Sequence, residues 1–234
     1  MRTPRRVPGD EYRVFTVERT WGIVRAVFER PLRALFRMRV YGVDRIPRHG
    51  GAVLAVNHIA GADIVLIAIS QPRTIRYMAK AELFTYNRAL TTVIRHGGTF
   101  AVRRGEPDRE ALRTARAVVR AGHLLGMFVE GTRQESEQIG TVMPGAALVS
   151  IAENVPIVPC VIQGSIYLKQ RPWHPVTVVY GEPIEPSVVS GQGKVEALTQ
   201  LLDAELRSLQ RFAQSAIRAG RPRSAVAPQS GAYG

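Results

Sequence analysis

Short apolar runs recur along most of the chain and alternate with stretches of helical periodicity. The runs predict strands at residues 52–56, 74–79, 98–103, 124–129, 157–162 and 175–180. Several of them lack polar alternation, which is typical of strands covered on both faces. Helices are predicted between them, near 62–70, 86–95, 108–121 and 142–152. A final helix is predicted from about 195 to 217. Strands alternating with helices predict an α/β fold with a mixed, largely parallel sheet flanked by helices.

The N-terminal region follows a different pattern, in which apolar residues are three or four positions apart. The members of this stripe are Val17, Trp21, Val24, Phe28, Leu32 and Leu35. Their spacing predicts an amphipathic helix within residues 11–40. Pro31 interrupts the pattern, which predicts a kink or two successive helices. Such a helix can lie in a membrane interface or pack on the domain core, and the sequence favours neither role.

Length and composition predict one sizeable domain with basic ends. The 234 residues suit a single α/β domain over 41–217. Residues 1–10 are predicted to be a flexible basic arm and 11–40 a helical membrane-associating segment. Residues 218–234, rich in Gly, Pro, Ser and Arg, are predicted to be a disordered basic tail.

The formal charge of +13 is concentrated outside the central domain. Residues 1–48 carry twelve Arg and five acidic residues, a net +7, and residues 207–234 carry five Arg and no acid. The remaining residues are nearly neutral. Basic ends around a neutral body favour an anionic membrane surface as a partner, whereas a nucleic-acid enzyme more often carries charge along its central groove. We therefore expect no nucleic-acid partner.

The sequence shows no segment of roughly 20 apolar residues that would span a bilayer. The basic start runs into Pro8, Gly9, Asp10 and Glu11, so no secretory signal is predicted. These features predict a protein at the cytoplasmic face of the cell membrane. A single cysteine, Cys160, excludes an internal disulfide and a Cys-rich zinc site, and we expect it to be a small buried residue in a strand.

The first candidate for chemistry is a histidine that follows the run at 52–56. His58 and Asp63 are five positions apart, and the small residues between them permit a tight strand-to-helix turn. A carboxylate can hold one imidazole nitrogen and fix its tautomer, which leaves the other nitrogen to act as a general base. The alternatives are a structural histidine and an aspartate that merely caps the following helix.

The sequence shows no obvious protein nucleophile that His58 could activate. It contains no Gly-x-Ser-x-Gly elbow, no Walker-type loop and no dinucleotide fingerprint. Cys160 has no neighbouring histidine in the sequence, and further metal ligands beside His58 and Asp63 are not evident. These features favour direct attack by a substrate hydroxyl, with neither a metal nor a resident cofactor.

Charged residues end two other predicted strands. Arg103 and Arg104 close the run that starts at Gly98, and Glu130 and Arg133 follow the run at 124–129. Ligands gather at the carboxyl ends of strands in open α/β sheets, and arginine forks suit phosphate oxygens. We therefore expect a phosphate-bearing substrate beside His58, although each arginine alone also fits a solvated surface charge.

The order of these segments resembles the four motif blocks of the glycerolipid acyltransferase family, whose best-known members are 1-acyl-sn-glycerol-3-phosphate acyltransferases. The blocks are Asn57-His58-x4-Asp63, Gly98-x5-Arg104, Glu130-Gly131-Thr132-Arg133 and Val155-Pro156-Ile157-Val158-Pro159. The resemblance extends from about residue 40 to Gly181-Glu182-Pro183-Ile184 and so covers most of the folded chain.

The resemblance implies transfer of a fatty acyl group from acyl-CoA or acyl carrier protein to a lysophospholipid hydroxyl. The leading acceptor is lysophosphatidic acid, which gives phosphatidic acid. In this reading His58 takes the hydroxyl proton and Asp63 orients His58. The residues implied to hold the acceptor's phosphate and glycerol are Arg104, Glu130, Gly131, Thr132 and Arg133. Secondary site residues are Asn57, Gly98, Arg103 and Pro159, the last in the block implied to shape the acyl or acceptor side of the pocket.

The sequence departs from the family pattern at three positions, of which the second and third bear on the acceptor and the first on loop stiffness. Val129 stands where proline precedes the Glu-Gly-Thr-Arg block, Met143 replaces a frequent basic residue, and Arg103 replaces a frequent acidic one. Another lysolipid or a glycolipid is therefore an alternative acceptor. A second class of function is a basic membrane- or nucleic-acid-binding protein without catalysis.

Overall fold

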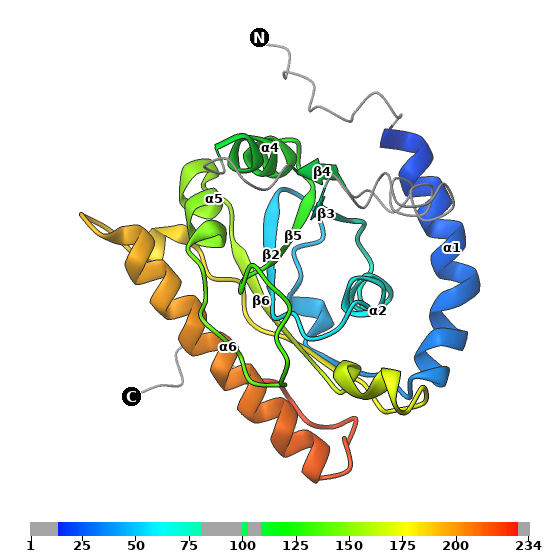
Figure 1. Ribbon diagram of the computed structural model, residues 1–234. Coiled ribbons are helices and arrows are strands. Elements are labelled where there is room, and N and C mark those ends of the chain that lie inside the picture. The colour runs from blue at the N-terminus through cyan, green and yellow to red at the C-terminus, as the bar shows by residue number, and fades with distance from the viewer. Residues whose placement is uncertain (1–13, 81–99, 103–108, 229–234) are drawn as a thin grey trace.

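The structure, a computed structural model, describes residues 14–80, 100–102 and 109–228. Among these residues, seven strands form one sheet in the order β1-β7-β6-β2-β5-β3-β4 (Figure 1). The strands are β1 (Arg39–Tyr41), β2 (Ala52–Val56), β3 (Ile75–Lys80), β4 (Phe100–Val102), β5 (Leu124–Phe128), β6 (Ile157–Gln163) and β7 (Thr177–Tyr180). β6 and β7 pair antiparallel, and the other neighbours pair parallel. The predicted mixed, largely parallel sheet is confirmed.

Helices cover both faces of this sheet (Figure 1). α4, α5 and α6 pack over one face, α2 packs over the other, and α1 lies against the outer side of α2. The α-helices are α1 (Val14–Leu35), α2 (Asp63–Ser70), α4 (Arg109–Arg120), α5 (Gly145–Glu153) and α6 (Lys194–Arg218). The 3₁₀ helices are η1 (Val43–Arg45), η3 (Ser165–Lys169) and η4 (Pro186–Val188). The helix predicted near 86–95 lies outside the described residues.

The core consists of two apolar clusters separated by the sheet. Alternate residues of β2 point to opposite sides, so that Val53 joins the cluster under α5 and α6 while Leu54 joins the cluster under α2. Every residue of β2 and of β6 is buried. A fully buried aliphatic side chain stabilises the fold by about 1.5–3 kcal/mol, so an unbroken apolar run belongs in a central strand. Cys160 is free and buried in β6, where burial raises the pKa of its thiol well above the usual value.

The structure adds one strand that the sequence pattern did not indicate. β1 has three residues, Arg39 to Tyr41, and pairs with β7 at the sheet edge. Three residues are too few to show a period of two, so the backbone pairing with β7 defines this strand.

The N-terminal stripe divides between the core and the surface. α1 is one continuous helix that includes Pro31, so the alternative of two successive helices is not what the structure has. Leu32 packs against the core, whereas Val27, Phe28 and Leu35 are 56%, 51% and 38% exposed. Predictions for the side chains of residues 17, 21 and 24 lie outside the description. No helix in the described ranges is long and apolar enough to cross a membrane.

Part of the tail that was expected to be disordered instead packs on the domain. The Arg45 guanidinium donates hydrogen bonds to the carbonyls of Ala227 (2.7 Å) and Pro228 (2.9 Å), and the Tyr41 hydroxyl donates to the Pro222 carbonyl. Ala227 is buried in the cluster under α6. The polar composition of the tail concealed this contact because its backbone carbonyls, rather than its side chains, make the hydrogen bonds. The prediction of disorder is therefore corrected for residues 219–228, while 1–13 and 229–234 lie outside the description.

Candidate active site

The loops that follow β2 and β5 lie side by side because the two strands end in register. Val56 and Phe128, the last residues of these strands, are paired. Beyond them, the Val129 amide donates to the Val56 carbonyl (2.9 Å), and the Gln134 amide donates to the His58 carbonyl (2.8 Å). Parallel pairing thus brings the histidine loop and the Glu-Gly-Thr-Arg segment to one edge of the sheet.

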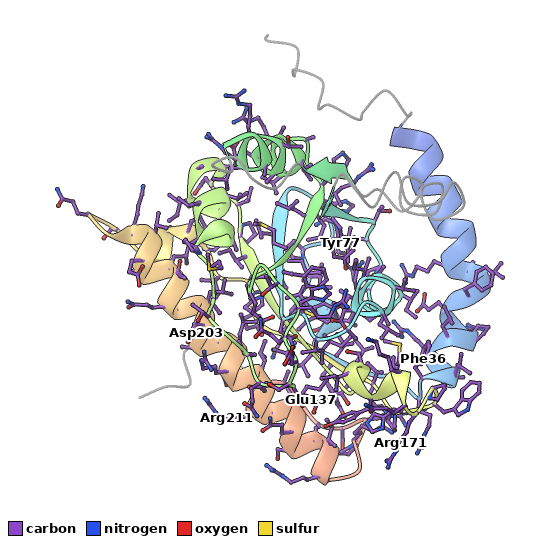
Figure 2. All side chains as sticks on the ribbon, viewed as in Figure 1. Phe36, Tyr77, Glu137, Arg171, Asp203 and Arg211 are labelled. Atoms are coloured by element: carbon purple, nitrogen blue, oxygen red, sulfur yellow. The ribbon has the colours of Figure 1, made fainter. Side chains whose placement is uncertain are left out.

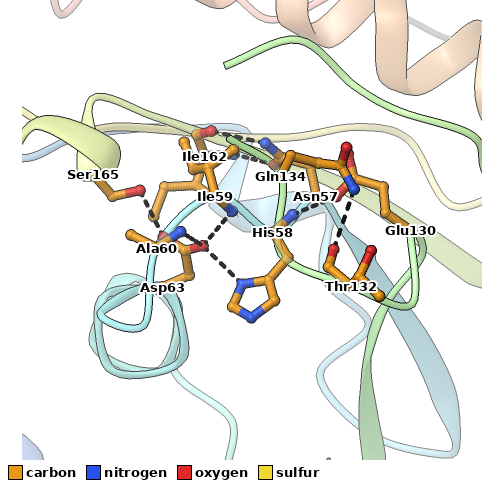
Figure 3. A network of polar contacts seen from close by, with 10 residues as sticks. All are labelled: Asn57, His58, Ile59, Ala60, Asp63, Glu130, Thr132, Gln134, Ile162 and Ser165. Atoms are coloured by element: carbon orange, nitrogen blue, oxygen red, sulfur yellow. Dashed lines mark hydrogen bonds and ion pairs between the residues drawn. The ribbon is translucent and has the colours of Figure 1, made fainter. Parts of the chain in front are cut away.

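His58 and Asp63 form a hydrogen-bonded pair in this loop (Figure 3). His58 Nδ1 lies 3.0 Å from Asp63 Oδ2, and the same oxygen accepts the amides of Ile59 (2.8 Å) and Ala60 (2.7 Å). Asp63 is fully buried. It is the first residue of α2, but its carboxylate bonds backward to the loop and makes no cap hydrogen bond to the helix. The simple helix-cap alternative therefore does not describe Asp63.

Ser165 completes the hydrogen bonding of the Asp63 carboxylate. Its hydroxyl donates to Asp63 Oδ1 at 2.6 Å, and Ser165 is 1% exposed. Gly164 makes this approach possible, because it has a φ of +90° and a Cβ there would lie 2.2 Å from the Pro175 carbonyl oxygen. Sequence reasoning missed Ser165, which is 102 positions from Asp63. Its one available signal was its place directly after a buried strand.

The His58 ring is fixed from a second side by an aromatic stack. It lies on the Phe128 ring with centroids 3.9 Å apart and planes inclined by 22°, and Tyr77 stacks beyond Phe128. Figure 2 places Tyr77 inside the fold. A carboxylate accepts hydrogen bonds and cannot donate them, so neutral His58 carries its proton on Nδ1 and a lone pair on Nε2. Figure 3 shows Nε2 directed away from Asp63, and the side chain is 15% exposed.

Glu130 lies at the same end of the sheet as His58 and bonds to the backbone of two loops. Its Oε2 accepts the His58 amide (2.7 Å) and its Oε1 accepts the Gly140 amide (2.9 Å). The residue is 7% exposed. Burial raises the pKa of the Glu130 carboxyl and outweighs the two amide hydrogen bonds, which act in the opposite direction. Glu130 thus holds two loops together, because each of its oxygens accepts a backbone amide.

The rest of this segment forms an exposed turn beside the histidine loop. Gly131 has a φ of +69°, a conformation that favours glycine, and its amide donates to the Phe128 carbonyl. Thr132 and Arg133 are exposed. A Cβ placed on Gly61 would lie 3.8 Å from a terminal nitrogen of Arg133, so this guanidinium lies next to the loop that carries His58 and Asp63.

Asn57 and Pro159 are both buried, but they differ in their relation to the site. Asn57 Oδ1 accepts a hydrogen bond from the Ile162 amide (2.8 Å), and Asn57 Nδ2 donates one to the Ile162 carbonyl (3.1 Å). This pair of bonds ties the end of β2 to β6. The Pro159 ring would contact a Cβ on Gly181, on the face of the sheet covered by α6. The structure therefore does not bring Pro159 to His58. Gly98, Arg103 and Arg104 lie outside the described residues.

The described groups provide a base with a free nitrogen, a carboxylate held by four donors, and a neighbouring guanidinium. This arrangement can remove a proton from a hydroxyl and hold an anion near it. No group of three or more His, Cys, Asp and Glu side chains is placed to hold a metal ion within the described ranges. The fold and the site together are those of an α/β enzyme with a candidate general base at the carboxyl ends of its strands.

Comparison with known proteins identifies the family of this enzyme. The acyltransferase family model matches residues 37–163, which is more than half of the chain, so the protein belongs to the acyltransferase family. A 1-acyl-sn-glycerol-3-phosphate acyltransferase from Bacillus subtilis (strain 168) is 25% identical over 182 residues, covering 74% of this chain and 88% of that protein. The crystal structure of the 1-acyl-sn-glycerophosphate (LPA) acyltransferase PlsC from Thermotoga maritima matches with a TM-score of 0.67. It is 21% identical, covers 85% of this chain and 81% of its own, and shows the same fold.

Proposed function

We propose that this acyltransferase moves a fatty acyl group from acyl-CoA or acyl carrier protein to the free hydroxyl of lysophosphatidic acid, giving phosphatidic acid. The observation that carries the proposal is the His58–Asp63 pair, whose free Nε2 lies at the same sheet edge as Arg133. The acceptor is suggested by the name of the Bacillus subtilis relative. The family membership supplies the acyl-transfer chemistry.

In the proposed reaction His58 acts first as a base and then as an acid. Nε2 accepts the proton of the acceptor hydroxyl while the hydroxyl oxygen attacks the thioester carbonyl carbon. The tetrahedral intermediate then collapses, the carbon–sulfur bond breaks, and the leaving thiolate takes the proton from Nε2. Asp63 stabilises the imidazolium through the Nδ1 hydrogen bond. General acid–base catalysis of this kind contributes typically 10²–10⁴-fold.

Arg133 is the described residue best placed to receive the acceptor's phosphate. It is exposed, and its side chain has no hydrogen bond or ion pair within the described part of the chain. A guanidinium fork matches phosphate oxygens, and the Arg133 guanidinium lies next to Gly61, in the loop that carries His58. Arg104 remains a second predicted phosphate ligand.

Met143 bears on which headgroup the enzyme accepts. A Cβ on Gly131 would lie 4.0 Å from Met143 Cγ, and Met143 is 51% exposed. The residue that replaces the frequent basic one therefore lies beside the turn that presents Arg133. We expect a weaker charge requirement at the headgroup than a basic residue here would impose, and the choice of acceptor is the first thing to measure.

We also propose peripheral attachment to the anionic cytoplasmic face of the membrane through α1. Exposed Val27, Phe28 and Leu35 give this helix an apolar surface, and the basic N-terminal region adds electrostatic attraction. Replacing Val27 and Phe28 with Asp should reduce sedimentation with phosphatidylglycerol vesicles. The same replacement at Val188, which is 60% exposed elsewhere, is the control, and equal losses would contradict the role of α1.

The decisive experiment measures acyl transfer across a panel of lysolipid acceptors, with products identified by mass. His58→Ala should lower kcat/KM by about 10³-fold because the base is lost, with folding unchanged. The matched control is His174→Ala, which removes a histidine whose ring packs at a tilt against that of Tyr167, and it should retain activity. Undiminished thiol release by His58→Ala would refute the catalytic assignment, and preference for another lysolipid would refute the acceptor.

A further inference from the structure

A second concave site lies at the amino ends of the central strands, whereas His58 lies beyond their carboxyl ends. A cavity of about 390 Å³ opens where β2, β3 and β5 begin. The loops before these strands line it, and α1 closes one side with Gly22 and Arg25. The five residues of β2, about 17 Å of strand, separate this edge from the loop that holds His58. The proposed acyl transfer makes no use of the cavity.

The charged side chains that line the cavity are all basic. They are Arg25, Arg48, Arg73, His49 and His123, and none of the described lining residues is an aspartate or glutamate. Glu29 pairs with Arg25 through Nε (2.6 Å) and with Arg33, so the charge of Arg25 is partly balanced. Arg48 and Arg73 form no ion pair within the described residues, and positive charge of this kind attracts anions.

The fold itself accounts for only part of this charge. Arg73 donates to the carbonyls of Pro47 (2.7 Å), Gly50 (2.6 Å) and Gly122 (3.1 Å), so it ties the three loops together. Arg48 and His49 are exposed, and neither side chain has a hydrogen bond or ion pair in the described ranges. The hydrogen-bond donors of Arg48 and His49 therefore take no part in holding the described fold together.

Thr74 contributes a third donor at the same cavity. Its hydroxyl has no hydrogen bond to the described part of the chain, although the side chain is only partly exposed. Hydroxyl, imidazole and guanidinium groups can all donate hydrogen bonds to phosphate oxygens in proteins. Arg73, already fixed by three carbonyls, adds a positive charge that does not have to be ordered when an anion binds.

We propose that this cavity is a second anion site, which binds a phosphate mono- or diester through Arg48, His49 and Thr74 in the field of Arg25 and Arg73. The volume is at the lower end of the range for small-molecule pockets, so it suits a phosphate with a small polyol rather than a whole lipid. Phe28 is 51% exposed three residues after Arg25 on α1, so apolar surface adjoins the cavity. The phosphate source is either the headgroup of an anionic lipid or a soluble phosphate ester.

The site is tested by titrating the full-length protein with inorganic phosphate and with glycerol phosphate, followed by calorimetry. Because the proposed acceptor site beside Arg133 can also bind these ligands, the Arg48→Glu/His49→Ala variant should lose one of the wild type's binding sites, with at least about tenfold weaker binding at that site. The matched control is Arg211→Glu, which changes charge equally at an exposed arginine on α6 (Figure 2) and should bind as the wild type does. No phosphate binding by the wild type, or equal losses in the two variants, would overturn the proposal.

A second arm identifies the source of the phosphate. Binding to vesicles of phosphatidylglycerol in phosphatidylcholine is compared for the same two variants. A larger loss in Arg48→Glu/His49→Ala assigns the site to a lipid headgroup, and equal losses assign it to a soluble ester. Acyl transfer to a detergent-dispersed acceptor should be unchanged in both variants, because neither contains a change at the His58 edge. Failure of this site would therefore leave the proposed function standing.

Discussion

The carboxyl edge of the sheet, where β2, β3 and β5 end, and the amino edge, where they begin, use opposite kinds of side chain to fix their loops. At the carboxyl edge, Asp63 and Glu130 accept backbone amides from the loops after β2 and β5. At the amino edge, Arg73 and Arg33 donate to backbone carbonyls, including those of Ile69 and Ser70 at the end of α2. One edge is held by buried carboxylates, the other by guanidinium groups.

The polarity of a parallel α/β sheet explains this difference. Helices begin near the carboxyl ends of the strands and finish near the amino ends, so free amides gather at one edge and free carbonyls at the other. Carboxylates satisfy amides and arginines satisfy carbonyls. The carboxylate edge can in addition hold an imidazole as a base, which is why the candidate catalytic group lies there. The arginine edge is suited to holding anions.

The largest effect is expected from weakening the carboxylate that orients His58. Asp63→Asn keeps the shape of the side chain but replaces one acceptor oxygen by an amide group that cannot accept from His58 Nδ1. We expect kcat/KM to fall by about 10³–10⁴-fold, because the imidazole loses its orienting partner and the charge that stabilises its protonated form. Steady-state acyl-transfer rates check this. A loss below tenfold in a folded variant would show that Asp63 has no such role.

Removing the principal clamp at the amino edge should affect stability rather than rate. Arg73→Met keeps the aliphatic stem and deletes three hydrogen bonds to loop carbonyls. We expect the free energy of unfolding to fall by about 2–4 kcal/mol, measured by denaturant titration. Arg48→Met is the matched control at the same edge and should stay within about 0.5 kcal/mol of the wild type. Equal effects of the two changes would contradict the clamp.

A smaller change is expected from the serine that supports Asp63. Ser165→Ala deletes the donor to Oδ1 and leaves the three donors to Oδ2 in place. We expect kcat to fall by about tenfold with KM little changed, because Asp63 is aimed less well and the acceptor site is untouched. Ser165→Thr should restore most of the rate. The control is Ser70→Ala, another buried serine, which should leave kcat unchanged, and an increased KM at unchanged kcat for Ser165→Ala would count against the idea.

The smallest predicted effect is a pH dependence at Glu130. Because burial raises the pKa of Glu130 in the folded protein, the folded state binds more protons than the unfolded one. The contribution of this group to stability is therefore full below the unfolded value near 4.5 and is lost as the pH rises through the folded value. The free energy of unfolding of the wild type should therefore rise relative to that of Glu130→Gln as the pH falls from about 7 to about 5. A gain in the opposite direction would show that the amide hydrogen bonds outweigh burial.

Local pattern was sufficient for most of the strands and helices and for the candidate pair, His58 and Asp63. The apolar run at 52–56 is β2 without change of bounds, and the run at 157–162 differs from β6 by one residue. Parallel strands bring their carboxyl ends to one end of the sheet, so the placing of His58 and the segment at 130–133 at the same end was also predictable. These features depend on the immediate chain or on a rule common to the fold class.

The partners of individual polar atoms were not predictable. The pattern did not indicate that Glu130 accepts the amides of His58 and Gly140, because a buried carboxylate must satisfy its oxygens with whichever donors surround it. Ser165 was missed because its contact with Asp63 spans 102 positions. The packed segment at 219–228 was missed because its carbonyls find Arg45, which a composition argument does not consider.

Sequence by itself therefore determined most of the strands and helices, the family, and the placing of a histidine and an aspartate in one loop, since each depends on spacing along the chain. Only the tertiary structure decided which carboxylate supports the base and which braces a loop, how the stripe of α1 divides between core and surface, and that a basic cavity forms opposite the site. These features arise where segments far apart in the sequence meet, and burial there makes every polar atom depend on neighbours that the chain order does not reveal.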